Sequence, residues 1–182
     1  TGINALVFFM GDIFRKAGVE NPDFAATITM FIQVIFTVVA VYLVESLGRR
    51  QLIVYSSMGL LICHLAFIIL FFFKINGFLI VATAMLYFAA FSIGWAPIAA
   101  LYACEIMPNR FKTIGIPLCF FCQWFLSFLI TSTLSFFVEK FDLHGCFFIY
   151  FLFTLVGLYF GKCVMLESKG KTVEEMEIEF MK

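Results

Sequence analysis

Three short clusters of acidic and basic side chains lie at the ends of long apolar segments of this chain. The clusters are residues 45–50, 105–112 and 167–171. Carboxylates pair with guanidinium and ammonium groups, and several such pairs together can shift the balance between two conformations. These residue types therefore favour reversible ion pairing, and they suggest a protein that moves.

The spacing of the clusters predicts that all three share one face of the molecule. Two apolar segments separate each cluster from the next, so the chain crosses twice and returns to the side that it left. Acidic and basic groups at this face can then pair across a bundle. The alternative is that these residues only set the topology and cap the ends of helices.

Neutral amides are the strongest hydrogen-bonding side chains within the apolar segments. Asn4, Gln33 and Gln123 each offer both donors and acceptors, as every sugar hydroxyl also does. Trp124 could stack on the apolar face of a sugar ring. We take these four residues as candidates for binding a neutral, hydroxyl-rich solute. The alternatives are amides that only join helices, worth about 0.6 to 2 kcal/mol each, and a tryptophan that only packs.

Gly94 and Pro97 interrupt one of the apolar segments, in the sequence Gly94-Trp95-Ala96-Pro97. Proline lacks a backbone N–H and frees a carbonyl group, so a break in the helix is expected here. Broken helices at membrane depth often mark binding sites for solutes, although a simple proline kink gives the same pattern. Both residues are further candidates for binding.

The apolar segments that position these side chains are long enough to cross a bilayer. The chain has 182 residues, of which 63% are hydrophobic and 13% charged, and a spanning helix needs about 20 apolar residues. Residues 3–14 form a shorter run, interrupted by Asp12, that looks like part of a truncated helix. The sequence therefore predicts an all-α integral membrane protein. The runs without Asp, Glu, Lys or Arg are residues 24–44, 52–73, 78–104, 113–138 and 145–161.

Composition and motifs also exclude several classes of function. The formal net charge is zero, so we expect no nucleic-acid partner. No triad, paired-carboxylate or phosphate-binding pattern is present, so we expect neither an enzyme nor a cofactor. Cys119 and Cys122 have metal-ligand spacing but no second pair, so we expect no metal site and six buried single thiols. His64 has no carboxylate in its own segment, and we expect it only to pack.

Lysine and arginine placement predicts that the clusters and the C-terminus lie in the cytoplasm. Eight such residues flank that side and four flank the other. Thr172 and Glu175 fit a capping box, so the hydrophilic tail is expected to hold a short helix or, alternatively, a frayed end. We divide the chain into a transmembrane bundle, residues 1–166, and a cytoplasmic tail, residues 167–182. The cytoplasmic flanks carry Arg49, Arg50, Arg110, Lys112, Lys162, Lys169, Lys171 and Lys182, and the outer flanks carry Arg15, Lys16, Lys74 and Lys140.

The order of these motifs resembles the sugar porter family of the major facilitator superfamily, which includes the glucose transporters. Residues 1–4 look like the Gly-Ile-Asn of that family's seventh helix, and residues 45–50 look like the loop after its eighth. Residues 94–97 and 105–112 resemble the Gly-Trp-Gly-Pro and the charged ending of the tenth helix. Gln123-Trp124 is similar to the eleventh-helix amide–tryptophan pair, and residues 167–172 are similar to the closing motif.

The resemblance implies the six-helix C-terminal bundle, helices 7 to 12, of a twelve-helix major facilitator fold in the plasma membrane. Its partners are then a small-molecule sugar, the lipid bilayer and the missing N-terminal half. The four amide and tryptophan candidates fall where the family contacts its sugar. The charged clusters are then expected to form a cytoplasmic gate that includes Glu45, Arg49, Arg50, Glu105, Arg110, Lys112 and Glu167.

We therefore predict transport of a neutral sugar, with a hexose favoured, by alternating access around a site at the membrane midplane. Ala100 stands where many family members have a sugar-contacting tryptophan, and Ser92 where animal glucose transporters have glutamate. These differences leave pentoses and polyols open as substrates. A sugar-sensing receptor of the same fold is a second hypothesis, because it would bind the solute without moving it, and a structural membrane subunit is a third.

Overall fold

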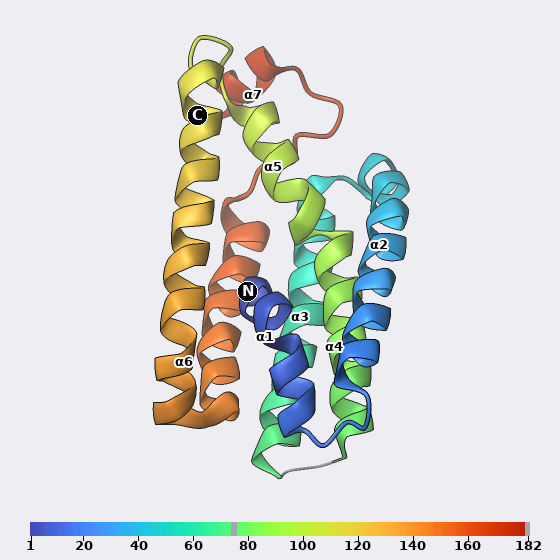
Figure 1. Ribbon diagram of the computed structural model, residues 1–182. Helices are drawn as coiled ribbons and strands as arrows, with labels where there is room; N and C mark the ends of the chain where they lie inside the picture. Colours follow the sequence, from blue (N-terminus) through green and yellow to red (C-terminus); the bar gives the residue numbers. More distant parts are fainter. Residues whose placement is uncertain (74–75, 181–182) are drawn as a thin grey trace.

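The computed structural model describes residues 1–73 and 76–180, and their regular structure is helical. Long helices run up and down the molecule and pack side by side, as Figure 1 shows. Lys74 and Lys182, which entered the prediction of orientation, lie outside the described residues. The helices are α1 (Ile3–Lys16), α2 (Pro22–Leu47), α3 (Arg49–Phe72), α4 (Gly77–Ile93), α5 (Trp95–Ile106), α6 (Lys112–Tyr159), the π-helix η1 (Phe160–Val164) and α7 (Val173–Phe180).

The label α6 covers two helices that turn back on each other. Asp142 has φ 56° and ψ 177°, a backbone region that is almost restricted to glycine, so the helix breaks there. Figure 1 shows the two resulting limbs side by side, yellow descending and orange ascending. The break lies between the last two predicted apolar runs, residues 113–138 and 145–161.

Five segments of the described chain are long and apolar enough to cross a membrane. Each overlaps one of the five predicted runs, so the all-α membrane fold is confirmed. The helices α4 and α5 together form one of these segments, interrupted at Gly94. The segments are Pro22–Leu47, Arg49–Phe72, Gly77–Ile106, Lys112–Leu134 and Phe136–Val164.

Aromatic side chains fill the core between α1, α3, α4 and the second limb of α6. Phe14, Phe67 and Tyr87 are fully buried. The rings of Phe67 and Phe147 stack at 4.5 Å between centroids, which joins α3 to α6. The helix α1 packs on this core. Its first residues lie midway along the bundle, as Figure 1 shows.

The cysteines are not all buried, contrary to the expectation. Cys63 and Cys146 are buried, whereas Cys119, Cys122 and Cys163 are exposed. The three exposed thiols lie on the first limb of α6 and on η1, where apolar side chains face outward from the bundle. An apolar sequence alone does not distinguish burial in protein from exposure to lipid.

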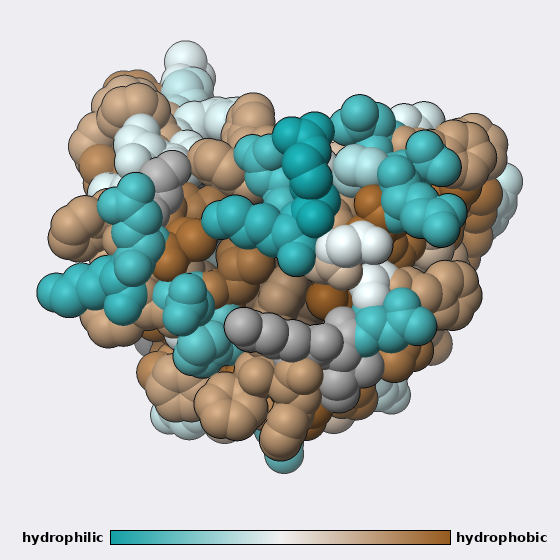
Figure 2. All heavy atoms as spheres, turned by 60° about the horizontal axis from the view of Figure 1, so that its bottom comes forward, coloured by the Kyte–Doolittle hydropathy of each residue, from teal (hydrophilic) through white to brown (hydrophobic). Residues whose placement is uncertain are grey.

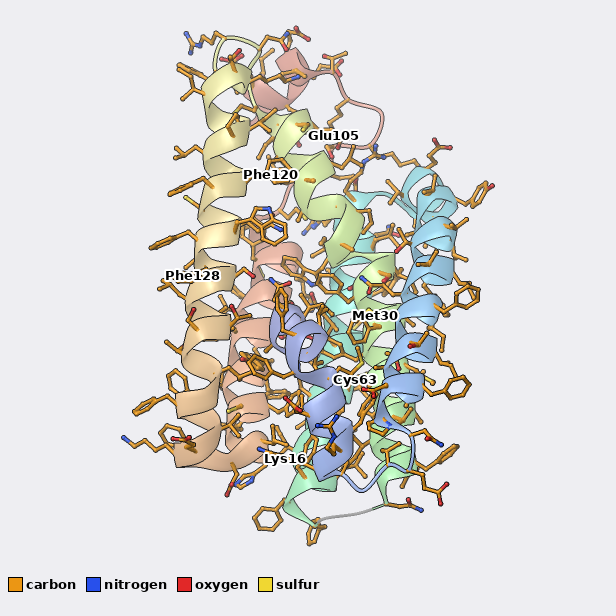
Figure 3. The ribbon with its side chains drawn as sticks, in the orientation of Figure 1. Lys16, Met30, Cys63, Glu105, Phe120 and Phe128 are labelled. Atoms are coloured by element: carbon orange, nitrogen blue, oxygen red, sulfur yellow. The ribbon has the colours of Figure 1, made fainter. Side chains whose placement is uncertain are left out.

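A cavity lies at one end of the bundle. Figure 3 places Glu105 at the upper end and Lys16 at the lower end. At the lower end, hydrophilic side chains lie among hydrophobic ones, as Figure 2 shows. A cavity of about 450 Å³ lies there between α1 and both limbs of α6, with apolar walls that include Phe9 and Leu134 and with Asp12, Lys16 and Glu139 among its charged lining residues.

Candidate functional site

An ion pair joins two of the three charged clusters at the upper end of the bundle. Arg49 at the start of α3 places Nη2 at 2.7 Å from Glu105 Oε1 near the end of α5. Arg49 Nε also donates to both carboxylate oxygens of Glu105, at 3.2 Å each. The two side chains are only 16% and 24% exposed, so this pair is less screened by water than an ordinary surface pair.

The third cluster reaches the same place through Glu167. Its Oε1 and Oε2 accept the backbone N–H groups of Arg49 at 2.9 Å and Arg50 at 3.0 Å, which are unpaired donors at the start of α3. A carboxylate is favourable there because the amino end of a helix carries partial positive charge. Gly48 allows this approach: its φ is 89°, and an added Cβ would lie 2.8 Å from Glu167 Oε2.

Further hydrogen bonds fasten the start of the tail to the helices. Ser168 Oγ donates to Glu105 Oε2 at 2.6 Å, and Lys169 Nζ donates to the carbonyl of Ser46 at 2.7 Å. Arg50 Nη2 donates to the carbonyl of Lys162 at 2.5 Å, in the middle of η1. The charged clusters therefore form one connected network over α2, α3, α5 and η1.

The remaining members of the predicted gate lie outside this network. Arg110 lies 3.9 Å from Glu177 of α7, and the two side chains are 72% and 39% exposed. Within the described chain, Glu45 and Lys112 make no hydrogen bond or ion pair through their side chains. The structure thus joins Glu105 to Arg49 and leaves Glu45 exposed at the same end.

The tail continues into a short helix that packs on α5. Thr172 N–H donates to Glu175 Oε2 at 2.8 Å, and Glu175 N–H donates to Thr172 Oγ1 at 3.3 Å, which are the two bonds of the capping box. Met176 is buried against the rest of the molecule. The α7 helix is therefore docked at the upper end.

Asn4 joins α1 to the first limb of α6 at membrane depth. Its Nδ2 donates to Ser127 Oγ at 2.5 Å. Gln123 is four residues before Ser127, so both lie on one face of the helix. Gln123 and Trp124 are nonetheless exposed, Trp124 by 63%. Gln33 on α2 is half-buried. In the described residues, the side chains of Gln33 and Gln123 neither donate nor accept a hydrogen bond.

Gly94 separates α4 from α5, as the sequence predicts. Its φ of −125° and ψ of −73° end one helix, and Trp95 begins the next. An added Cβ would lie 2.4 Å from Ser56 Cβ and 2.7 Å from the carbonyl of Leu52, so only glycine lets the break lie this close to α3. Pro97 falls in the first turn of α5, where the absent N–H leaves no helical bond unmade.

Several residues of these sites are missing from the sequence-based prediction. Ser127, which binds Asn4, could have been found because it lies one helical turn from Gln123. Trp95 donates through Nε1 to Ser57 Oγ at 2.9 Å, a bond that holds the start of α5 on α3. Ser168 lies within the predicted cluster of residues 167–171, but its sequence does not indicate the bond to Glu105.

Comparison with a family model shows which proteins this chain is related to. The model for the sugar (and other) transporters matches residues 1–180. The chain belongs to the sugar transporter family. Members of this family are transporters, and the chain is accordingly not an enzyme.

Individual relatives agree with this assignment. The chain is 30% identical to the facilitated trehalose transporter Tret1 of Bombyx mori, over 98% of this chain and 37% of that protein. It is 28% identical to the facilitated glucose transporter member 8 of solute carrier family 2 of Mus musculus, over 99% of this chain and 43% of that protein. The chain thus spans about two fifths of the length of these relatives.

Solved structures establish the superfamily. The proton:xylose symporter XylE bound to 6-bromo-6-deoxy-D-glucose aligns with a TM-score of 0.88 and 25% identity, over 98% of this chain and 39% of that one. The inward-open xylose transporter XylE from E. coli aligns with a TM-score of 0.79 at 24% identity. The fold is therefore a helical bundle of the major facilitator class, in an integral membrane protein.

Proposed function

We propose that the complete protein moves a neutral sugar, a hexose, across the membrane by alternating access, with this bundle as its C-terminal half. The proposed location is the plasma membrane, with residues 167–182 as a cytoplasmic tail. Sugar transport is supported by the family and by relatives whose names specify trehalose, glucose and xylose. These names agree on a neutral, hydroxyl-rich solute and differ in its size.

The observation that carries the proposal is the connected network at one end of the bundle. Arg49 is held by its backbone through Glu167 and by its side chain through Glu105. We assign this network, with Arg50, to a cytoplasmic gate that holds the end of this half rigid. Glu45 and Lys112 keep their charges free of partners in the described part of the chain, so they are available to the N-terminal half when the gate closes.

The amides and the helix break define the proposed sugar site. Asn4 lies beside the limb of α6 that carries Gln123 and Trp124. Exposure of these two side chains leaves them free to contact a sugar. Gln33 and the interrupted segment at Gly94 and Pro97 complete the proposed set of contacts.

Uptake by the complete protein in liposomes tests this function. Radiolabelled glucose, xylose and sorbitol are offered separately, and saturable glucose uptake that is accelerated by unlabelled sugar inside is expected. Preferred uptake of xylose or sorbitol would correct the substrate. Saturable binding without uptake would indicate a sensor instead, and neither binding nor uptake would indicate a structural subunit.

A further inference from the structure

Two side chains from other helices hold the chain just before α1. Tyr87 of α4 donates through its hydroxyl to the carbonyl of Thr1, and His64 Nε2 of α3 lies 3.2 Å from the same oxygen. A carbonyl oxygen only accepts hydrogen bonds and has two lone pairs, so Nε2 carries the proton of the imidazole here. The Thr1 carbonyl is thereby anchored to both α3 and α4.

Both donors are fixed by their surroundings. His64 and Tyr87 are fully buried, and their rings meet edge to face with centroids 5.2 Å apart. Phe67 packs on Tyr87 at 6.2 Å, and Phe147 lies 6.3 Å from His64. Neither donor can turn away without disturbing the aromatic core, so the position of the Thr1 carbonyl is determined by that core.

Gly2 sets the direction in which α1 leaves the anchored Thr1 carbonyl. It has φ 79° and ψ 9°, a left-handed conformation that turns the chain into the helix. An added Cβ would lie 2.5 Å from the Tyr150 ring, so the second limb of α6 closes on the turn from the other side. The carbonyl of Gly2 then accepts the N–H of Leu6 at 3.2 Å, which begins the helical ladder.

Asn4 follows Gly2 by two residues and is the first residue of α1 with a side-chain amide. We infer that His64 and Tyr87 are positioning residues for the sugar site: by holding the Thr1 carbonyl they set the angle at which α1 presents the Asn4 amide to the solute and to Ser127. This inference rests on the proposed function, in which Asn4 contacts the sugar. It assigns to His64 a hydrogen-bonding role beyond the packing expected from sequence.

Substitutions that remove one donor and keep the ring or the volume test this role in the complete protein. Tyr87→Phe is expected to raise the KM for sugar about two- to tenfold, which corresponds to the loss of one hydrogen bond, with kcat changed less than KM. His64→Leu should do the same, whereas His64→Gln keeps a donor and should restore the KM. Tyr55→Phe, at an exposed tyrosine of α3, is the matched control.

A double-mutant cycle separates positioning from a general loss of stability. If Tyr87 acts through Asn4, Tyr87→Phe has no further effect on KM once Asn4→Ala is present. Additive effects on KM, or an unchanged KM in Tyr87→Phe at equal surface expression, would overturn the inference.

A chemical readout keeps the test independent of transport. Asn4→Cys is introduced into the complete protein after all its native cysteines are replaced, and its modification by a water-soluble thiol reagent is timed. Tyr87→Phe should speed the modification several-fold because the start of α1 is released, and Tyr55→Phe should not. An unchanged rate refutes the positioning role even in a protein that transports sugar, and an increased rate supports it even if no sugar is transported.

Discussion

Glu167 Oε1 accepts the backbone N–H of Arg49 at 2.9 Å, although 118 residues separate the two along the chain. The side chain of the same arginine pairs with Glu105, which belongs to another helix. Two carboxylates therefore fix one residue from two directions. As a result, the start of α3, the end of α5 and the start of the tail are held as one unit.

Removal of the Glu167 carboxylate is expected to loosen this unit. Glu167→Ala leaves the N–H groups of Arg49 and Arg50 without their acceptor and should lower the stability of the complete protein by about 1 to 2 kcal/mol. Thermal unfolding of the purified protein in detergent measures the loss. Glu174→Ala, on the exposed face of α7, is the matched control and should leave unfolding unchanged. An equal shift in both variants would argue against the cap.

Loss of the Glu105 carboxylate is expected to act on the conformational balance. Glu105→Ala removes the partner of Arg49 and of Ser168, and a change of about 1.4 kcal/mol shifts a two-state equilibrium tenfold. Transport should fall without loss of membrane insertion. Sugar uptake at equal surface expression measures this effect.

Arg49 supplies the companion experiment for the ion pair. Arg49→Ala and Glu105→Ala should not be additive, because each one alone already breaks the pair. Glu45→Ala, at the same end but outside the pair, should not couple to Arg49. Unchanged uptake in Glu105→Ala would remove this residue from the gate.

The membrane segments were predictable because length and apolarity alone define them. The segments at residues 52–73 and 78–104 could be predicted without knowing which helices they contact. The apolar length needed to cross a bilayer is the same wherever a helix packs. The shared face of the charged clusters followed equally from counting crossings. The break at Gly94 was visible because Gly94 and Pro97 both disfavour an uninterrupted helix.

The partners of the polar groups were not predictable in the same way. The sequence suggests that Glu45 pairs with a basic side chain. In the structure, Arg49 forms its ion pair with Glu105, and Glu45 is exposed. The choice depends on how far each helix extends at the upper end, which the sequence does not specify. Likewise, nothing near His64 in sequence indicates the Thr1 carbonyl, because that contact joins residues 63 positions apart in the chain.

A methyl group at Gly94 is expected to force α5 away from α3. The added Cβ would meet the backbone carbonyl of Leu52 at 2.7 Å, and a backbone atom cannot move aside as a flexible side chain can. Gly94→Ala should therefore cost about 1 to 3 kcal/mol by overpacking and reduce the yield of folded protein. Size-exclusion chromatography and thermal unfolding report the loss.

Gly11 provides the matched control for this substitution. Its added Cβ would meet only Asp23 Oδ1, at an ordinary 3.6 Å. Because alanine favours a helix over glycine, Gly11→Ala should be neutral or stabilising by up to about 1 kcal/mol. If Gly94→Ala behaved in the same way, α3 and α5 would have to be less closely packed than the structure shows.

Asn4 and Ser127 together distinguish a sugar contact from a simple link between helices. The link predicts that Asn4→Ala and Ser127→Ala have similar effects, since each removes the same 2.5 Å hydrogen bond. A sugar contact predicts more for Asn4→Ala, because it also removes a donor and an acceptor for the hydroxyls. We expect the KM for sugar to rise about tenfold in Asn4→Ala and about two- to threefold in Ser127→Ala. Initial rates of uptake over a range of sugar concentrations provide both values, and equal rises in KM would assign Asn4 to helix packing alone.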